Sequence, residues 1–188
     1  TALAATRAGL PIDAEHAAQI ATLARQLPVR FEGGQVWLGN ADVTDAIRTE
    51  EAGMNASRVS ALAAVRAALV DLQHSFRRLP GLVADGRDMG TVIFPGAALK
   101  VYLTASAACR AERRYQQLIA KGLTATIADL RADLEARDAR DMSRSVAPLK
   151  PAQDALVLDN SELTIEQAVD QVLDWWQQRQ PFTPGVQG

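Results

Sequence analysis

Short apolar segments that alternate with helical segments are the feature that most restricts the fold of this chain. LVADG (82–86), LKVYLTAS (99–106) and DALVLD (154–159) each have the composition of a buried strand. Strands that alternate with helices form parallel sheets, because a crossover helix must return the chain to the same end of the sheet. The sequence therefore predicts an α/β fold with a parallel sheet flanked by helices.

The helical segments are recognised by apolar periodicity and by residues that start or stop a helix. Asp13 is the expected N-cap of the first strongly periodic helix. Residues 1–10 also have helical composition but begin without a start signal, so we expect further sequence before Thr1. The expected helices cover 13–27, 49–79 as a pair ending at Pro80-Gly81, 107–120 ending at Lys121-Gly122, about 124–143, and Thr164 to Trp175-Trp176.

Gly33-Gly34 lies between two short β-prone runs, which is a typical signal of a β-hairpin. The hairpin interrupts the alternation of strands and helices. We therefore expect it to belong to a small subdomain inserted into the parallel-sheet fold.

Composition excludes several classes of protein. The chain has 188 residues, 48% of them hydrophobic, which suits one domain with a small insert and argues against disorder. Its net charge of −2 argues against a non-specific nucleic-acid binder. The single cysteine, Cys109, excludes an internal disulfide and a cysteine-based zinc site. There is no apolar run long enough to span a membrane and no export signal, so we expect a soluble, cytoplasmic protein.

The first group of residues that could form a functional site is Asp85-Gly-Arg-Asp-Met-Gly90, directly after a predicted strand. Ligands of open α/β sheets bind beyond the C-terminal ends of strands, where this turn would place two carboxylates and one guanidinium. A turn of solvated charges is the alternative.

The second group is Arg137-Asp-Ala-Arg-Asp-Met-Ser-Arg144, where helical spacing places Arg137, Asp141 and Arg144 on one face. A salt-bridged surface helix is the alternative reading. Three arginines within eight residues nevertheless repel one another unless an anion or the interleaved aspartates compensate. A phosphate matches the guanidinium fork well.

The third group, Arg110-Ala-Glu-Arg-Arg114, follows the strand-like segment 99–106 and places Arg110 and Arg114 at i, i+4. By itself it also fits a solvated surface. Together the three groups predict a site that handles several phosphates.

These segments resemble those of bacterial cytidylate kinases. The resemblance runs from about residue 26 to 175 and is most specific in ADGRDMGTVIFP (84–95) and RDARDMSRSVAPL (137–149); IRTEEAGMNAS (47–57) and ALVLDNSELTIEQAV (155–169) also match. It implies a P-loop NTPase-like α/β sheet, a nucleoside-monophosphate-binding insert over 13–60 with a small antiparallel sheet, and lid helices over 107–145. The activity it implies is ATP-dependent phosphoryl transfer to CMP or dCMP by a monomer.

The resemblance also implies roles for single residues. On the acceptor side, Ser57, Arg66 and Asp88 would recognise cytosine, Arg87 and Arg144 would hold the phosphate, and Arg137 and Asp141 would contact the sugar. A carboxylate that accepts from the exocyclic amino group distinguishes cytosine from uracil, which has no donor there. On the donor side, Asp85 would orient water on Mg²⁺, and Arg110, Arg114 and Arg140 would face ATP.

One departure from the family is large. No segment matches Gly-x-x-x-x-Gly-Lys-Ser/Thr, the loop whose backbone N–H groups cradle ATP phosphates. We therefore expect a strand, loop and helix upstream of Thr1, and no appreciable kinase activity from these residues alone. The alternatives are a non-catalytic nucleotide-binding module, or a kinase for another small acceptor such as UMP, AMP or shikimate.

Overall fold

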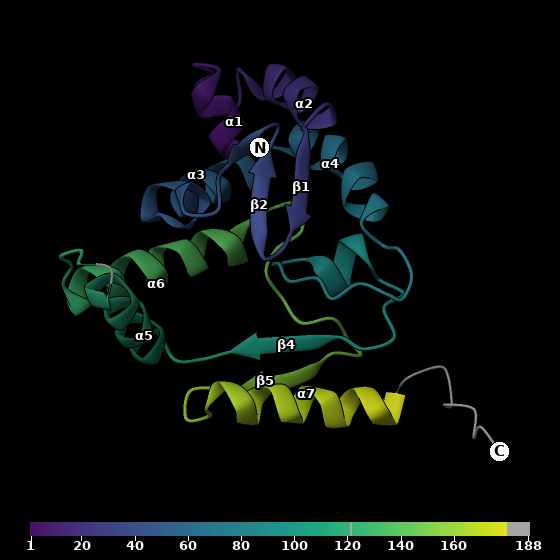
Figure 1. The fold of residues 1–188 in the computed structure, drawn as a ribbon, viewed down its shortest axis with the longest axis vertical. Helices are drawn as coiled ribbons and strands as arrows, with labels where there is room; N and C mark the ends of the chain where they lie inside the picture. The colour runs from purple at the N-terminus through teal and green to yellow at the C-terminus, as the bar shows by residue number, and fades with distance from the viewer. Residues whose placement is uncertain (121, 180–188) are drawn as a thin grey trace. The chain divides into compact units, whose positions relative to one another are not determined.

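The computed structural model describes residues 1–120 and 122–179 (Figure 1). The chain forms two compact units, the first from Thr1 to Ala84 and the second from Asp85 onward. Together they contain a parallel strand pair, a separate antiparallel sheet and α-helices, so the predicted α/β class is confirmed.

Helices form the core of the first unit. They are α1 (Ala2–Arg7), α2 (Ala17–Arg25), α3 (Glu50–Ser60) and α4 (Ala63–Ser75), with a 3₁₀ turn, η1 (Ala46–Arg48). Ala21 and Ala24 on α2 are buried with Val65 on α4. Small side chains at this contact allow close approach of the two helices. The helical composition of residues 1–10 and the pair of helices within 49–79 are confirmed.

The hairpin signal at Gly33-Gly34 is also confirmed. Strands β1 (Val29–Glu32), β2 (Gln35–Leu38) and β3 (Ala41–Asp42) form an antiparallel sheet in the order β1-β2-β3. Gly33 and Gly34 both have positive φ, at 60° and 79°. Two successive positive φ values are what a tight hairpin turn of matching twist requires, and glycine adopts them without strain.

Asp13 does not cap α2, so this prediction is wrong. Its carboxylate accepts a hydrogen bond from the His16 backbone N–H at 2.9 Å and contacts the His16 ring at 2.7 Å. The Asp13 side chain closes a local turn instead, and α2 begins at Ala17.

The second unit is built on two parallel strands, β4 (Val101–Thr104) and β5 (Leu156–Asp159), which pair Val101 with Leu156 and Thr104 with Asp159. A five-residue helical turn, η2 (Met89–Ile93), precedes β4. The helices are α5 (Ala107–Ala120), α6 (Ile127–Ser143) and α7 (Ile165–Arg179). Helix α7 runs beside β5 in Figure 1, and Arg179 at its end donates to the Asp154 carbonyl at 3.2 Å.

Local signals set the ends of these helices. The Thr126 hydroxyl accepts from the Asp129 N–H and starts α6. At α7, the Thr164 hydroxyl accepts from the Gln167 N–H while the Gln167 side chain accepts from the Thr164 N–H, a reciprocal capping box. Gly122 follows α5 with a φ of 73°, as expected of a helix C-cap. Lys121 lies outside the described residues.

The predicted strand over 82–86 is wrong, because these residues have no regular secondary structure. Val83 is fully exposed, at 100%, and Leu82 is also exposed. A strand is stable only when its backbone pairs with a neighbour, and no neighbour pairs with this segment among the described residues.

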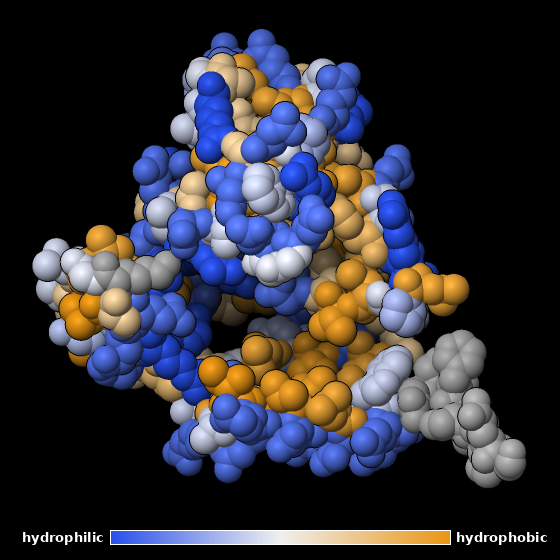
Figure 2. Space-filling view, viewed as in Figure 1, coloured by the Kyte–Doolittle hydropathy of each residue, from blue (hydrophilic) through white to orange (hydrophobic). Residues whose placement is uncertain are grey.

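Helix α7 exposes part of its apolar face. Ala168, Val172 and Trp175 are half-buried, whereas Ile165, at 80% exposure, and Val169, Leu173 and Trp176 remain exposed. Figure 2 shows hydrophobic surface where Figure 1 places β4, β5 and α7. Among residues 1–120 and 122–179, no helix has the length and apolar character to cross a membrane.

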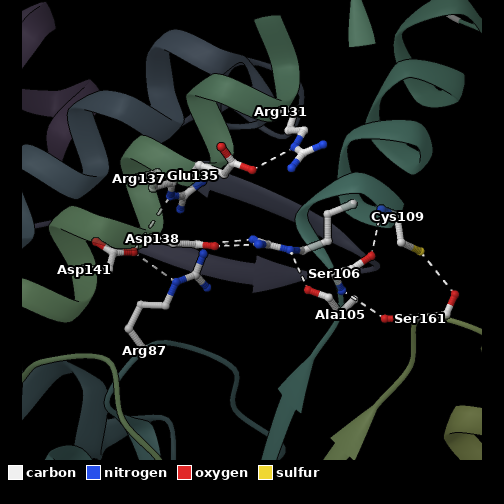
Figure 3. A network of polar contacts seen from close by, with 11 residues as sticks. Arg87, Ala105, Ser106, Cys109, Arg131, Glu135, Arg137, Asp138, Asp141 and Ser161 are labelled. Carbon is white, nitrogen blue, oxygen red and sulfur yellow. Dashed lines mark hydrogen bonds and ion pairs between the residues drawn. The ribbon is translucent and has the colours of Figure 1, made fainter. Parts of the chain in front are cut away.

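Ser161 ties together the C-terminal ends of the two parallel strands (Figure 3). Its hydroxyl donates to the Asp159 carboxylate at 2.6 Å and accepts from the Ser106 backbone N–H at 2.9 Å. The Ser161 hydroxyl, followed by the Ser161 N–H, lowers the pKa of Asp159 below its ordinary value.

We expect Ser161→Ala to raise the pKa of Asp159 toward its ordinary value, as measured by carbon NMR of the carboxyl group during acid titration. A lowered pKa in the folded state stabilises the fold above the ordinary carboxyl range, and the benefit disappears as pH falls through the lowered value. Ser161→Ala should therefore reduce the pH dependence of stability in acid. Ser75→Ala, which removes an exposed hydroxyl from α4, is the control; an unchanged Asp159 titration in Ser161→Ala would contradict the assignment.

Candidate functional site

A buried carboxylate, Asp141 on α6, is the centre of an arginine cluster in the second unit. Asp141 is 2% exposed. Its oxygens lie 3.3 Å from Arg87 Nε, 4.0 Å from Arg137 Nε and 3.7 Å from Arg144 Nη2. Figure 3 shows Arg87 and Arg137 converging on this carboxylate. Three guanidinium charges around one carboxylate give these four side chains a formal surplus of positive charge, which suits the binding of an anion.

Two of these contacts are local in sequence. Arg137 is one turn before Asp141 on α6, as the helical spacing predicts. Arg144, three residues after Asp141, is the C-cap residue with a ψ of 135°, so it reaches the carboxylate from just beyond the end of the helix. The alternative of a fully solvated charged helix is wrong for Asp141, because its side chain is buried. Arg87 is 54 residues away in sequence, and only the tertiary fold brings it to Asp141.

The backbone after α6 also folds back onto Asp141. The Asp141 carbonyl accepts from Arg144 Nε at 3.2 Å and from the Leu149 N–H at 2.8 Å. The intervening Ala147 has a φ of 48°, a left-handed conformation that costs energy in a residue with a Cβ. Carboxylate and carbonyl of one residue thus fix both the arginines and the loop that follows them.

A second ion pair joins α5 to α6. Arg110 donates through Nη2 and Nη1 to the two oxygens of Asp138, at 2.5 and 3.2 Å. Its Nε donates to the carbonyl of Ala105, the residue after β4, at 3.2 Å. The Arg110 side chain on α5 is therefore held against the loop that follows β4.

The other α5 arginines have different surroundings. Arg113 donates to the side-chain oxygen and the carbonyl of Asn160, at 3.0 and 2.5 Å, so it anchors α5 to the end of β5. Sequence reasoning gave Arg113 no separate role. Arg114 donates to Gln117 one turn later, at 3.3 Å, and Arg140 on α6 is exposed.

The turn 85–90 is shaped by its glycines. A Cβ on Gly86 would lie 2.9 Å from the Met89 Cγ, and one on Gly90 would lie 3.3 Å from the Lys100 side chain. A side chain at Gly86 would therefore require Met89 to move, and one at Gly90 would press against Lys100. Asp88 is buried, and its carbonyl accepts the Val92 N–H at 2.9 Å, which starts η2. Asp85 is exposed.

Within the first unit, Ser57 and Arg66 lie at the junction of α3 and α4. Ser57 is buried, and its carbonyl accepts from the Ser60 hydroxyl at 2.8 Å. Arg66 donates to the Ser60 carbonyl at 3.4 Å. These two predicted base-recognition residues are thus linked through Ser60.

Sequence reasoning missed the role of Asp138 as the partner of Arg110. The only signal was the alternation of arginine and aspartate along 137–141, which does not reveal which aspartate faces which arginine. Among the described residues, no group of three or more His, Cys, Asp or Glu side chains converges as a metal-binding cluster.

Removing the buried carboxylate should destabilise the second unit. We expect Asp141→Asn to lower the free energy of unfolding by about 2–4 kcal/mol, because it leaves partly buried guanidiniums without their counter-charge. Urea denaturation of Asp141→Asn and of Asp133→Asn, an exposed position on the same helix, provides the measurement. The control should stay within about 0.5 kcal/mol of the parent, and equal midpoints for the two variants would contradict the role of Asp141.

Comparison with known proteins identifies the family. A family model described as cytidylate kinase matches residues 1–178. The cytidylate kinase of Cupriavidus necator is 57% identical over 175 residues, which are 93% of this chain and 78% of that protein. Those of Polynucleobacter asymbioticus and Chromobacterium violaceum are 55% and 54% identical, over 94% and 95% of this chain and 79% and 80% of theirs. The chain belongs to the cytidylate kinase family.

Proposed function

We propose that this chain carries the acceptor-binding and lid regions of an enzyme that transfers a phosphoryl group from ATP to CMP or dCMP. The observation that carries the proposal is the cluster of Arg87, Arg137 and Arg144 around Asp141. Guanidinium forks bind phosphate oxygens in pairs, and the buried carboxylate keeps the forks in place before the ligand arrives.

We assign the acceptor phosphate to Arg87 and Arg144, and the sugar to Arg137 and Asp141. Arg87 is about two-fifths exposed, at 42% of its side chain, and can therefore meet a ligand without large rearrangement. Arg144 is nearly buried, with its Nε fixed on the Asp141 carbonyl. Arg144 would therefore orient the phosphate, and Arg87 would contact it from the solvent-accessible side.

We assign recognition of cytosine to Ser57, Arg66 and Asp88. Asp88 is buried, so a hydrogen bond from the exocyclic amino group of cytosine would form in a site of low dielectric, where an unmatched partner is costly. Uracil presents a carbonyl oxygen at the same position, and this oxygen would face the Asp88 carboxylate.

On the donor side we assign Arg110, Arg114 and Arg140 to ATP and Asp85 to water on Mg²⁺. An exposed single carboxylate fits this role, because Mg²⁺ keeps several waters and takes its other ligands from phosphate oxygens. When bound, Mg²⁺ supplies charge neutralisation of the phosphates. The arginines supply positioning and further neutralisation, and no covalent intermediate on the protein is needed.

We further propose that turnover needs a phosphate-binding loop outside these 188 residues. The sequence holds no Gly-x-x-x-x-Gly-Lys-Ser/Thr segment. The chain spans 78% of the Cupriavidus necator kinase. The exposed stripe of Ile165, Val169 and Leu173 on α7 supports the proposal, because a strand and helix that carried the loop would give this apolar face a partner.

Calorimetry with the two pyrimidine monophosphates tests the base assignment. We expect CMP to bind at least about tenfold more tightly than UMP, and Asp88→Asn to remove most of this preference, because one well-placed hydrogen-bond pair discriminates by about 1–3 kcal/mol. Thermal denaturation of Asp88→Asn verifies that it is folded. Equal affinity of the parent chain for CMP and UMP would reject the role of Asp88.

A coupled assay for CDP formation tests the loop proposal separately. The 188-residue chain should show no turnover with ATP, Mg²⁺ and CMP, since nothing in it cradles the donor phosphates. A chain extended by the upstream residues of its own reading frame should be active. Turnover by the 188 residues alone would contradict the loop proposal and leave the acceptor assignment intact.

A further inference from the structure

The ion pair between Arg110 on α5 and Asp138 on α6 uses the whole guanidinium group of Arg110. All three guanidinium nitrogens of Arg110 are engaged, two of them by the two oxygens of one carboxylate. This two-pronged geometry is the one in which arginine binds a phosphate group.

The contacts of Arg113 provide the contrast. Arg113 donates to the side-chain amide oxygen and the carbonyl of Asn160 and, at 3.5 Å, to the Leu163 carbonyl. These acceptors are neutral, and they belong to the connection between β5 and α7. An anion that bound Arg113 would leave the Asn160 and Leu163 oxygens without this donor. We therefore interpret Arg113 as a residue that stabilises the fold. Arg110 instead has a partner with the same charge sign as a phosphate.

The Arg110–Asp138 pair is also accessible. The two side chains are 31% and 25% exposed, so solvent weakens their attraction. By contrast, the Asp141 carboxylate is 3% exposed. Of Asp138 and Asp141, Asp138 is the one that a dissolved anion can replace at moderate cost.

We propose that Asp138 is a positioning residue that acts as an internal anion. It holds the Arg110 guanidinium in the phosphate-binding orientation. When a polyphosphate binds, its oxygens replace the Asp138 carboxylate as the partner of Arg110. A polyphosphate carries more negative charge than one carboxylate and therefore competes for Arg110. The exchange releases Asp138, so binding of the donor loosens a direct tie between α5 and α6. This inference rests on the proposed placement of Arg110 on the donor side.

Binding of inorganic tripolyphosphate, without metal and at constant low salt, tests the competition. Asp138→Asn keeps the shape of the side chain but removes the competing charge, so we expect tripolyphosphate to bind about three- to tenfold more tightly. Asp133→Asn is the matched control, because it removes the same charge from an exposed position on α6. Its affinity should stay within about twofold of the parent, since surface charges act weakly.

Arginine Nε–H NMR of the parent chain provides a measurement that needs no carboxylate variant. Tripolyphosphate should shift the Arg110 signal, identified by its loss in Arg110→Lys, and leave the Arg113 signal in place. If Asp138 only stabilises the fold, Asp138→Asn should lower the melting temperature and bind tripolyphosphate no more tightly than the parent. In the parent chain, the Arg110 signal should then not move when tripolyphosphate is added. That result would overturn the inference.

A parallel titration with CMP separates this inference from the proposed function. CMP affinity reports on the Asp141 cluster and the base-recognition residues, which Asp138→Asn leaves in place. Failure to bind CMP would reject the acceptor assignment, whereas the tripolyphosphate comparison would still decide the role of Asp138.

Discussion

The compensation of clustered positive charge by aspartates on α6 is the interaction on which the second unit depends. Arg87, Arg137 and Arg144 would repel one another without Asp141 between them. The carboxylate is buried, so its attraction to the guanidiniums is less screened than at a surface. Its backbone carbonyl also holds the loop that follows α6. The arginines are therefore placed before any ligand is bound.

A second carboxylate one turn earlier has a different environment and a different consequence. Asp138 is partly exposed and contacts an arginine from another helix. Asp141 is buried among Arg137 of its own helix, Arg144 at the end of that helix and Arg87 from the turn after Asp85. The same residue type on one helix thus provides a fixed contact and an exchangeable one. Solvent exposure makes the difference, because water and dissolved anions compete only where they can reach.

The parallel strands provide the rigid support for both contacts. Arg110 is fixed on the carbonyl after β4, and Ser161 after β5 hydrogen-bonds to the loop before α5. Side chains that lie at strand ends move little, because the strands are held by their neighbours and by the helices. The apolar stripe of α7 is one of the parts of this unit that the described residues leave exposed.

The sequence by itself determined the elements whose signals are local. The Gly33-Gly34 hairpin, the start of α7 at Thr164 and the shared helix face of Arg137 and Asp141 follow from turn chemistry and helical periodicity. Arg144 contacts Asp141 from the C-cap position, which helical periodicity alone does not predict. The motifs over 84–95 and 137–149 were sufficient to indicate the family. Asp13 was misassigned because an N-cap and an isolated turn use the same hydrogen bond.

Only the tertiary structure decided the contacts between distant segments. The pairing of Arg87 with Asp141 and of Arg110 with Asp138 joins residues that are 54 and 28 positions apart, and no periodicity relates them. The segment 82–86 has strand composition but no strand, because a strand also requires a neighbour to pair with. Local sequence specifies what a segment can form, and the rest of the fold supplies the partners that decide whether it does.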